Sequence, residues 1–491
     1  MITESHPRLR RPFPDRAARV GRVIALGCTL LALVQCVTGR PPASTESIAI
    51  VGVTVIDPST SSPPAPDQTI LVQNGEIYWV GPSGTVRYKA GTREIDGHGK
   101  FAIPGLWDAH VHFMNSGVTA LSLFIANGVT SVREMGGYID STRAWQARMR
   151  EGTLVGPRIV TPGPILESPS YLQNVVTRSQ RDPRLAPRIL PYRIGIKDAA
   201  DAHRAIDSLR KIRVDFIKFR TTASPEAVYG ILRYARRARL RVAGHQPVVP
   251  IASALDSGFT DLQHAILPPL SRSSPQSRDS VYRKFVEKDA FYTPTLTVSR
   301  TVTITGDSAS RAIFGPDAER LDSRRQYAPS ILLEWWKMQV DERRGDTSTR
   351  RLAAFNEAYW SSAADVHRMR ELGVKILAGT DAGSVLVYPG FTIHDELRLL
   401  VSDAKLTTRQ ALWSATVGPA QFAGLEDRLG TITVGKLADL VLLDDDPLAD
   451  IRNTQKVFGV MQRGRWFSRA DLDSLLAKVR AAVADSARVS R

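Results

Sequence analysis

Six residues that could bind a metal ion occur along this chain, each where a short apolar run ends and a polar loop begins. The runs cover residues 101–113, 215–220, 241–246, 261–265 and 375–382. The candidate residues are His110, His112, Lys218, His245, His264 and Asp381. In a (β/α)8 barrel the ends of successive parallel strands meet at one mouth, so residues distant in sequence become neighbours there. The series therefore predicts a TIM-type barrel that carries a metal-dependent hydrolytic site at its mouth.

The remaining strand patterns lie near the two ends of the chain. Alternating apolar runs at 48–56, 69–73 and 76–80 predict short antiparallel strands, and similar runs return at 438–443 and 457–461. With 491 residues, the chain is long enough for one large and one small domain. We therefore predict an α/β fold in which the barrel is inserted into a small β-sandwich built from both ends. The predicted sandwich segments are 47–100 and 425–468, around a barrel at 101–424 and before a C-terminal helix at 469–491.

Two stretches are expected to interrupt the strand-then-helix alternation of the barrel. They cover residues 164–194 and 267–360, and the second contains a strand-like run at 291–296. Insertions on the mouth side of a barrel commonly form lids and specificity loops.

The N-terminus has the pattern of an export signal. A stretch rich in arginine precedes the apolar run 23–37, which is too short to cross a bilayer comfortably and is typical of a signal peptide over residues 1–36. Export to the periplasm or cell envelope follows, by the general route or, through Arg10-Arg11, the twin-arginine route. The segment 33–36 resembles a lipoprotein cleavage box, so Cys36 is either lipidated and anchors the protein to the membrane or is a small apolar residue of the signal. The only other cysteine is Cys28, so the mature protein is expected to contain no disulfide.

The formal charge of +16 has no accompanying nucleic-acid motif. The basic residues are scattered, which favours a solvated surface, with weak attraction to anionic envelope polymers as the alternative. We therefore expect a small-molecule substrate and no nucleic-acid partner, and the oligomeric state is left open.

A histidine pair separated by one residue points both rings to one face of a strand. His110 and His112 form such a pair within Pro-Gly-Leu-Trp-Asp-Ala-His-Val-His at 104–112. Together with the segments 129–136, 379–383, 414–420 and 430–439, this stretch resembles the amidohydrolase superfamily, in particular its imidazolonepropionase-like and Xaa-Pro dipeptidase-like branch with a carboxylated lysine.

The resemblance implies two divalent metal ions, with zinc favoured and manganese or iron as alternatives. His110, His112 and Asp381 would hold one ion, and His245 and His264 the other. Lys218 would bridge them as a CO2-derived carbamate, because an ammonium group has no acceptor. Metal-activated hydroxide would then attack a C–N bond of an amide, peptide or cyclic amide. Asp381 would be the catalytic residue that takes up the proton and passes it to the leaving amine.

Each of these residues also has a structural interpretation. Lys218 could extend to solvent or pair with Asp215, and His245 or His264 could be a hydrogen-bonded core histidine. Arg220, on the same strand face as Lys218, either clamps a substrate carboxylate or pairs with an acidic residue. His394 either enters the mouth or stabilises the start of a helix.

Three other functions remain open at this stage. The same site could act as a lactonase or esterase. With one ion and an unmodified Lys218 the chain would be a mononuclear deaminase, and without turnover it would be an envelope binding protein. Arg-Thr-Thr-Ala-Ser-Pro at 220–225 replaces the glycine-rich turn expected of dipeptidases, so the exact substrate is left open.

Overall fold

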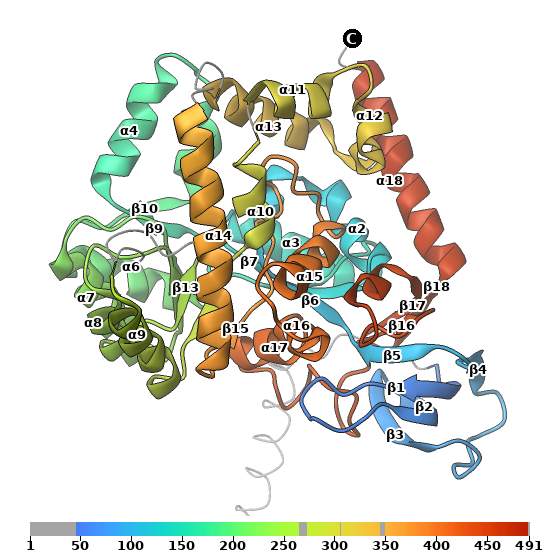
Figure 1. Cartoon of the computed structure of the whole chain (residues 1–491). Helices are drawn as coiled ribbons and strands as arrows, with labels where there is room; N and C mark the ends of the chain where they lie inside the picture. Colours follow the sequence, from blue (N-terminus) through green and yellow to red (C-terminus); the bar gives the residue numbers. More distant parts are fainter. Residues whose placement is uncertain (1–45, 265–272, 305, 344–348, 490–491) are drawn as a thin grey trace, which may run out of the picture. The chain divides into compact units, whose positions relative to one another are not determined.

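The computed structural model describes residues 46–264, 273–304, 306–343 and 349–489, all within the unit 44–491 (Figure 1). The predicted signal peptide at 1–36 and its Cys36 lie outside the described residues. Within the ranges just given, no helix combines the length and the apolar character needed to cross a bilayer.

The two ends of the described chain meet in one eight-stranded sheet (Figure 1). Its strands are β1 (Ile48–Val55), β2 (Ala65–Gln73), β3 (Glu76–Pro82), β4 (Arg93–Asp96), β5 (Phe101–Pro104), β16 (Leu440–Leu443), β17 (Val457–Gln462) and β18 (Arg465–Ser468). The antiparallel pair β5–β16 joins the N-terminal strands to the C-terminal ones, with Leu440 opposite Pro104. Both ends of the described chain thus contribute strands to one sheet, while the small sandwich domain and its bounds remain a prediction.

Aliphatic side chains hold this terminal sheet together. Ile50, Ile70, Leu440 and Leu442 belong to one apolar cluster, and each is fully buried. The alternation that predicted these strands follows from this packing, because every second side chain of a strand points to the same face.

Ten parallel strands form the middle of the chain, in two sheets. The first sheet has the order β6-β7-β8 and the second the order β10-β9-β11-β12-β13-β14-β15. Their bounds are β6 (Leu106–Val111), β7 (Val129–Glu134), β8 (Arg158–Val160), β9 (Ile165–Glu167), β10 (Arg193–Gly195), β11 (Ile217–Phe219), β12 (Val242–Gly244), β13 (Asp261–Gln263), β14 (Phe291–Thr293) and β15 (Lys375–Ile376). Parallel strands joined by helices confirm the predicted α/β class.

Backbone hydrogen bonds connect the two parallel sheets at two places. Between β8 and β11, Asp215 N donates to Thr161 O at 2.9 Å. Between β6 and the segment that follows β15, Ala109 N donates to Ala378 O at 2.9 Å and His112 N to Ala382 O at 2.7 Å. The arrangement is consistent with a TIM-type barrel, whose continuous ladder of strand pairs remains a prediction.

Helices surround the parallel strands (Figure 1). They include α2 (Leu121–Ala126), α3 (Ile139–Arg150), α4 (Pro169–Ser179), α6 (Ala199–Lys211), α7 (Pro225–Arg237), α8 (Ile251–Asp256), α9 (Pro275–Glu287), α14 (Thr349–Glu371), α15 (Thr392–Ser402), α16 (Thr408–Ser414) and α17 (Val417–Ala423). Helix α7 shows why the sequence forms them. The Ser224 side chain accepts a hydrogen bond from Ala227 N, Pro225 occupies the first turn, and Val228, Ile231 and Ala235 form a buried stripe.

The expectation that residues 291–296 belong to an insertion is wrong. Strand β14 lies inside the second parallel sheet, between β13 and β15, with Phe291 opposite both Asp261 and Lys375. The strand has only three residues, all buried, and so short an apolar run has no periodicity that could assign it to the barrel. The inserted helices begin after it, with α10 (Leu296–Thr301), α11 (Gly306–Phe314), α12 (Ala318–Leu321) and α13 (Ser330–Arg343).

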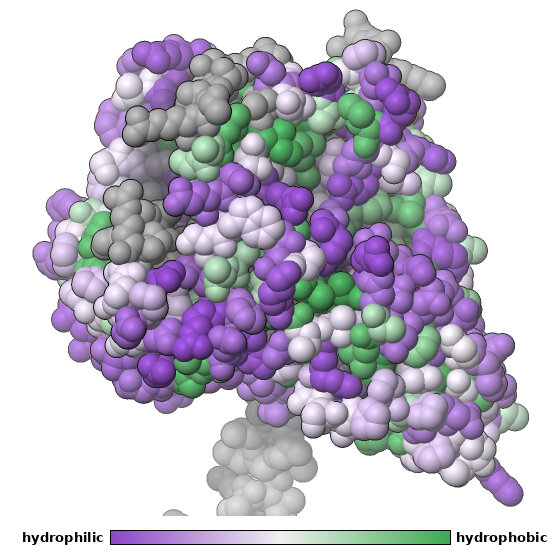
Figure 2. Space-filling model, viewed as in Figure 1, coloured by the Kyte–Doolittle hydropathy of each residue, from purple (hydrophilic) through white to green (hydrophobic). Residues whose placement is uncertain are grey.

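The C-terminal segment forms helix α18 (Arg469–Val489), which packs against α2 (Figure 1). The predicted C-terminal helix is therefore present, and its Leu472 and Val479 are buried. Figure 2 shows that hydrophilic residues cover most of the face in view and that apolar residues form small separate patches on it. A largely hydrophilic face agrees with the solvated surface that the scattered basic residues favour.

Candidate metal centre and active site

The six predicted ligands all lie at the ends of parallel strands. His110 is in β6 and His112 follows it, while Lys218 is the middle residue of β11. His245 and His264 come directly after β12 and β13, and Asp381 follows β15 in the loop that bonds to β6. Since parallel strands end at a common edge, the topology brings these side chains to one mouth.

Three of the six side chains form a compact group. His110, His112 and Asp381 offer ligand atoms that lie within 4.8 Å of one another. The Nε2 atom of each histidine is 3.3 Å from the same oxygen, Asp381 Oδ1. The His110 ring is fully buried, and its Nδ1 has no hydrogen-bond partner within the described ranges. A buried imidazole nitrogen without a partner is costly, and two histidines that share one carboxylate oxygen are donors that suit a divalent cation.

The other three candidates continue this group. The ring centroids of His110 and His264 are 4.6 Å apart, and those of His264 and His245 are also 4.6 Å apart. His264 Nδ1 is paired with the Thr295 hydroxyl at 2.8 Å, which leaves its Nε2 for a metal. Lys218 is buried and donates a hydrogen bond to Gln263 Oε1.

Backbone strain marks the same place. His264 and Asp381 have φ values of 66° and 63°, and Thr295 has 49°. Such left-handed conformations are uncommon outside glycine and persist only where the surroundings enforce them. For Asp381 the enforcing contacts are its own N–H, which donates to His110 O at 2.8 Å, and its Oδ2, which accepts from Ser384 Oγ at 2.9 Å.

The pKa values favour metal-binding protonation states. Burial lowers the pKa of His112 and His264 to about 4 and holds those of His110 and His245 well below the usual range, so the rings are neutral at neutral pH. Burial also lowers the pKa of Lys218 to about 7. A large share of this amine is therefore neutral at neutral pH, the form that reacts with CO2.

Asp381 behaves differently from the other buried groups. Burial alone would raise the pKa of its carboxyl group, but the hydrogen bond and charge of His110, with the charges of His112 and His264, bring that pKa below its usual range. Asp381 is therefore ionised and able to bind a cation or accept a proton.

Asp108 supports the site and was missed by the sequence reasoning. Its buried carboxyl group accepts hydrogen bonds from Thr380 Oγ1 at 2.6 Å and Thr380 N at 3.0 Å, and so fixes the residue before Asp381. Burial raises the pKa of Asp108 to about 7. The signal was present, because Asp108, His110 and His112 alternate and therefore share one strand face.

Glu167 also escaped the sequence reasoning. It is the last residue of β9, and its fully buried carboxylate pairs with Arg220 Nε at 2.9 Å. The Arg220 guanidinium also lies over the Tyr171 ring, 3.8 Å from its centroid. The acidic partner considered for Arg220 is thus present, and a role in substrate binding stays a prediction. No motif indicated Glu167, since it lies in a segment that seemed to be an insertion.

His394 does not enter the mouth. Its ring lies on α15, where Nδ1 pairs with Thr454 Oγ1 at 3.0 Å and Nε2 with Asn127 O at 3.1 Å. Asn127 precedes β7, at the opposite end of that strand from the one that pairs with Val111 beside the site. The substrate-binding role considered for His394 is therefore corrected to a structural one. A histidine near the start of a helix gives no sequence signal of which end of the barrel it faces.

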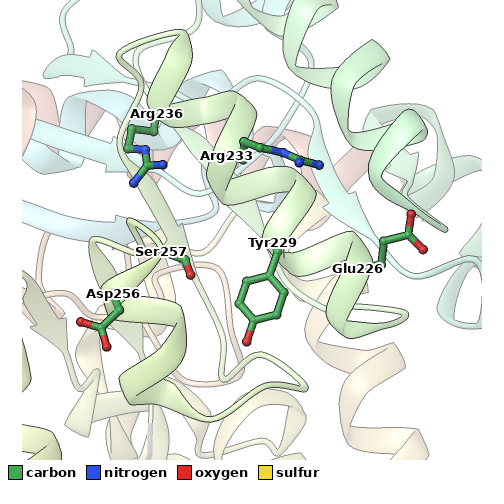
Figure 3. A pocket seen from close by; sticks show the side chains of 6 residues that line it. All are labelled: Glu226, Tyr229, Arg233, Arg236, Asp256 and Ser257. Atoms are coloured by element: carbon green, nitrogen blue, oxygen red, sulfur yellow. The ribbon is translucent and has the colours of Figure 1, made fainter.

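A cavity of about 490 Å³ lies on the outer helices, away from these residues (Figure 3). Side chains from α7 and from the end of α8 line it, and Figure 3 shows acidic and basic groups on its walls without a shared focus. None of the six candidate ligands is among its lining residues, which are Glu226, Tyr229, Arg233, Arg236, Asp256 and Ser257. We therefore place the candidate active site at the strand ends.

Comparison with known proteins supports this placement. Residues 321–467 match the model of the amidohydrolase family, a segment that includes Asp381. The resemblance to amidohydrolases is confirmed. A search of the curated proteins finds no match.

Several solved structures share the fold of this chain. The bottromycin amidohydrolase superposes with a TM-score of 0.68 at 21% identity, covering 92% of this chain and 93% of that one. The A. niger ochratoxinase gives 0.64 at 18% identity, with 86% and 96% covered. A Xaa-Pro dipeptidase with bound methionine gives 0.61 at 21% identity, with 86% and 100% covered. The likeness spans nearly the whole described chain and shows the fold.

Proposed function

We propose that this chain is an exported, binuclear metal-dependent amidohydrolase that cleaves a C–N bond of a small substrate. One observation carries the proposal: four histidines, a lysine and an aspartate from six separate positions gather at the ends of parallel strands. His110, His112 and Asp381 would hold one ion, His245 and His264 would hold the second, and Lys218, as a carbamate, would supply oxygen ligands to both. Zinc is the favoured metal, because neutral imidazoles and carboxylates suit it.

The chemistry of this proposal is divided between the ions and Asp381. Bound divalent ions supply Lewis acidity and lower the pKa of water. Asp381 Oδ1 faces the two histidines, so Oδ2, next to Ser384, is the oxygen left to take up the proton of the attacking water. The same carboxyl group then delivers the proton to the leaving nitrogen, since an amine leaves poorly until it is protonated.

The substrate class is inferred from the structural neighbours. These neighbours include an Xaa-Pro dipeptidase, an ochratoxinase and a bottromycin amidohydrolase. A dipeptide, an N-acyl amino acid or a cyclic amide is therefore the proposed substrate of this chain. Lactones and other esters should be assayed beside these substrates, because the site would attack them at least as readily.

A second candidate rests on Lys218. Its unmodified amine already has a hydrogen-bond acceptor, Gln263 Oε1, and Gln263 is held in turn by Asp261 Oδ2 at 3.1 Å. A lysine satisfied in this way favours the mononuclear deaminase, in which a single ion is bound and no carbamate forms.

Metal content separates the two candidates. For the binuclear enzyme, the metal-loaded mature protein should contain two ions per chain, and Lys218→Ala should lose one or both. Its kcat should fall by more than the about 10–100-fold typical of removing an outer-shell partner. Lys211→Ala, a change of an exposed lysine at the end of α6, is the matched control. A Lys218→Ala protein with wild-type activity and an unchanged ion count would contradict the binuclear assignment.

Export and lipidation belong to the proposal as well. They rest on the basic and apolar segments before residue 37 and on Cys36. Mass spectrometry of the mature N-terminus tests both, because cleavage before a lipid-modified Cys36 and cleavage without lipid give different masses. An uncleaved N-terminus on exported protein would contradict both.

A further inference from the structure

Two arginines share one buried carboxylate at the mouth. Glu167 Oε1 accepts hydrogen bonds from Arg193 Nη1 at 3.1 Å and from Arg220 Nε at 2.9 Å. Glu167 Oε2 accepts from Thr221 N at 3.2 Å and from Thr221 Oγ1 at 2.5 Å. Four hydrogen bonds thus fix a carboxylate whose side chain is fully buried, and through it they fix both guanidinium groups.

These arginines lie next to the candidate metal centre. Arg220 is two residues beyond Lys218, and its N–H donates to Leu166 O at 3.0 Å, which aligns β11 with β9. Arg193 begins β10, which pairs with β9, and it shares the Glu167 carboxylate with Arg220. Both guanidinium groups are therefore held where β9, β10 and β11 end, on the strand that carries Lys218 and on its neighbours.

Both guanidinium groups keep donors for a ligand. The Arg193 side chain is 10% exposed. Its buried Nε has no hydrogen-bond partner within the described ranges. Arg220 is 30% exposed, and Tyr171 supports one face of its guanidinium. An arginine packed in this way has lost most of its side-chain freedom before a ligand arrives, so little entropy remains to be lost on binding.

The charges do not balance. Arg193 and Arg220 carry two positive charges, and Glu167 supplies one negative charge. The other carboxyl group that faces Arg193 is Glu134, and burial raises its pKa well above the usual range, which favours its neutral form. The group keeps one positive charge, and an anionic ligand would neutralise it.

We propose that Arg193 and Arg220, positioned by Glu167, form a binding site for the carboxylate of the substrate. The inference rests on the proposed function and deepens it, because it selects N-acyl amino acids and dipeptides with a free carboxylate over cyclic amides and capped peptides. Guanidinium groups suit this task, since their parallel N–H donors match the two oxygens of a carboxylate.

Matched substrates test the specificity. N-acetyl-L-alanine and N-acetyl-L-alaninamide share the scissile bond and differ in the carboxylate. Arg193→Met and Arg220→Met should each lower kcat/KM for the acid by about 10–100-fold, the usual loss for a hydrogen bond to a charged group, mainly through KM. Turnover of the amide should change less than about threefold. Arg210→Met, on the exposed face of α6, is the control. Equal losses on both substrates, or no loss on either, would overturn the proposal.

A binding measurement separates this inference from the proposed function. Succinate offers a second carboxylate beyond the one that a metal could take, and acetate offers only one. In calorimetric titrations of the metal-loaded protein, Arg193→Met and Arg220→Met should weaken succinate binding at least tenfold and leave acetate nearly unchanged. Should the wild-type protein hydrolyse no substrate, the proposed function fails, and the succinate titration still decides the carboxylate site. Equal succinate affinity in the wild-type and variant proteins would overturn it.

The conservative variants Arg193→Lys and Arg220→Lys cover the case in which a methionine variant does not fold. Each keeps the positive charge and loses the paired donors. An intermediate affinity for succinate supports the site, and wild-type affinity in both lysine variants argues against paired recognition.

Discussion

The mouth of the parallel sheets and the terminal sheet are both made of strands, yet they bury opposite kinds of side chain. In the terminal sheet Ile50, Ile70 and Leu442 are fully buried in an apolar cluster. At the mouth the buried side chains include His110 and Lys218, and two residues of the site, His264 and Asp381, have left-handed backbones. Burial of apolar side chains stabilises the terminal sheet, while unpaired polar groups and backbone strain destabilise the mouth.

The terminal sheet and the mouth should therefore contribute differently to stability and to turnover. A buried imidazole nitrogen without a hydrogen-bond partner, such as His110 Nδ1, lowers the stability of the protein, and the proposed function accounts for its presence at the mouth. We therefore expect changes at the mouth to affect turnover far more than folding, and changes in the terminal sheet to do the reverse.

The largest expected effect is that of Asp381→Asn on turnover. Asparagine tolerates the φ of 63° and keeps one oxygen donor, so the fold and part of the metal should remain. The proton acceptor is lost, and kcat should fall by about 10²–10⁴-fold. Steady-state kinetics measure the turnover, metal analysis measures the bound ions, and a thermal melt measures the stability of the fold. Near-normal turnover in a metal-replete variant would show that another group takes the proton.

Next in size is Leu442→Ala in β16. The side chain is fully buried between Ala102 and Gly459 of the neighbouring strands, so truncation should lower the free energy of unfolding by about 2–5 kcal/mol. Urea unfolding measures the loss, and kcat should stay near normal at temperatures where the variant is folded. Tyr78→Ala, at a 61% exposed position of β3, is the control, expected within about 0.5 kcal/mol of wild type. A loss of kcat in folded Leu442→Ala would contradict the separation of the two regions.

The smallest effect sharpens the contrast between paired and unpaired buried histidines. His394 is paired at both nitrogens, and burial lowers its pKa to about 4. Between pH 6.5 and 4 the unfolded chain therefore binds more protons at this position than the folded chain does. The free energy of unfolding decreases as the pH is lowered through this range, by up to about 1.4 kcal/mol per pH unit. His394→Gln should remove this share of the slope without changing kcat.

Unfolding curves of wild type and His394→Gln at several pH values measure that slope. His203→Gln is the matched control, because His203 is a half-exposed residue of α6. Identical slopes in the wild-type and His394→Gln proteins would mean that His394 does not stay neutral in the folded state.

Much of the candidate site could be predicted from the sequence. The histidine pair at 110 and 112 reports its own geometry through the two-residue period of a strand. The other ligands were found because each ends an apolar run, and parallel strands must end at the same edge. Helix α18 could also be predicted, since its apolar residues keep a helical spacing over a long segment.

Other features needed the coordinates. The strand β14 is three buried residues long and carries no periodicity, so its place between β13 and β15 could not be inferred. The contacts of His394 depend on which end of the barrel α15 faces, and the sequence does not record this. Glu167 gained its role only when β9 and β10 were aligned beside β11.

The sequence by itself thus determined which residues could form a metal site, because ligand chemistry and strand periodicity are local properties. Only the tertiary structure decided what surrounds them: that Thr380 donates hydrogen bonds to Asp108, and that Glu167 holds two arginines beside the ligands. The partners in these contacts lie between 26 and 272 residues apart in the sequence. Such partners are chosen by how the strands pack side by side, and no local pattern records that choice.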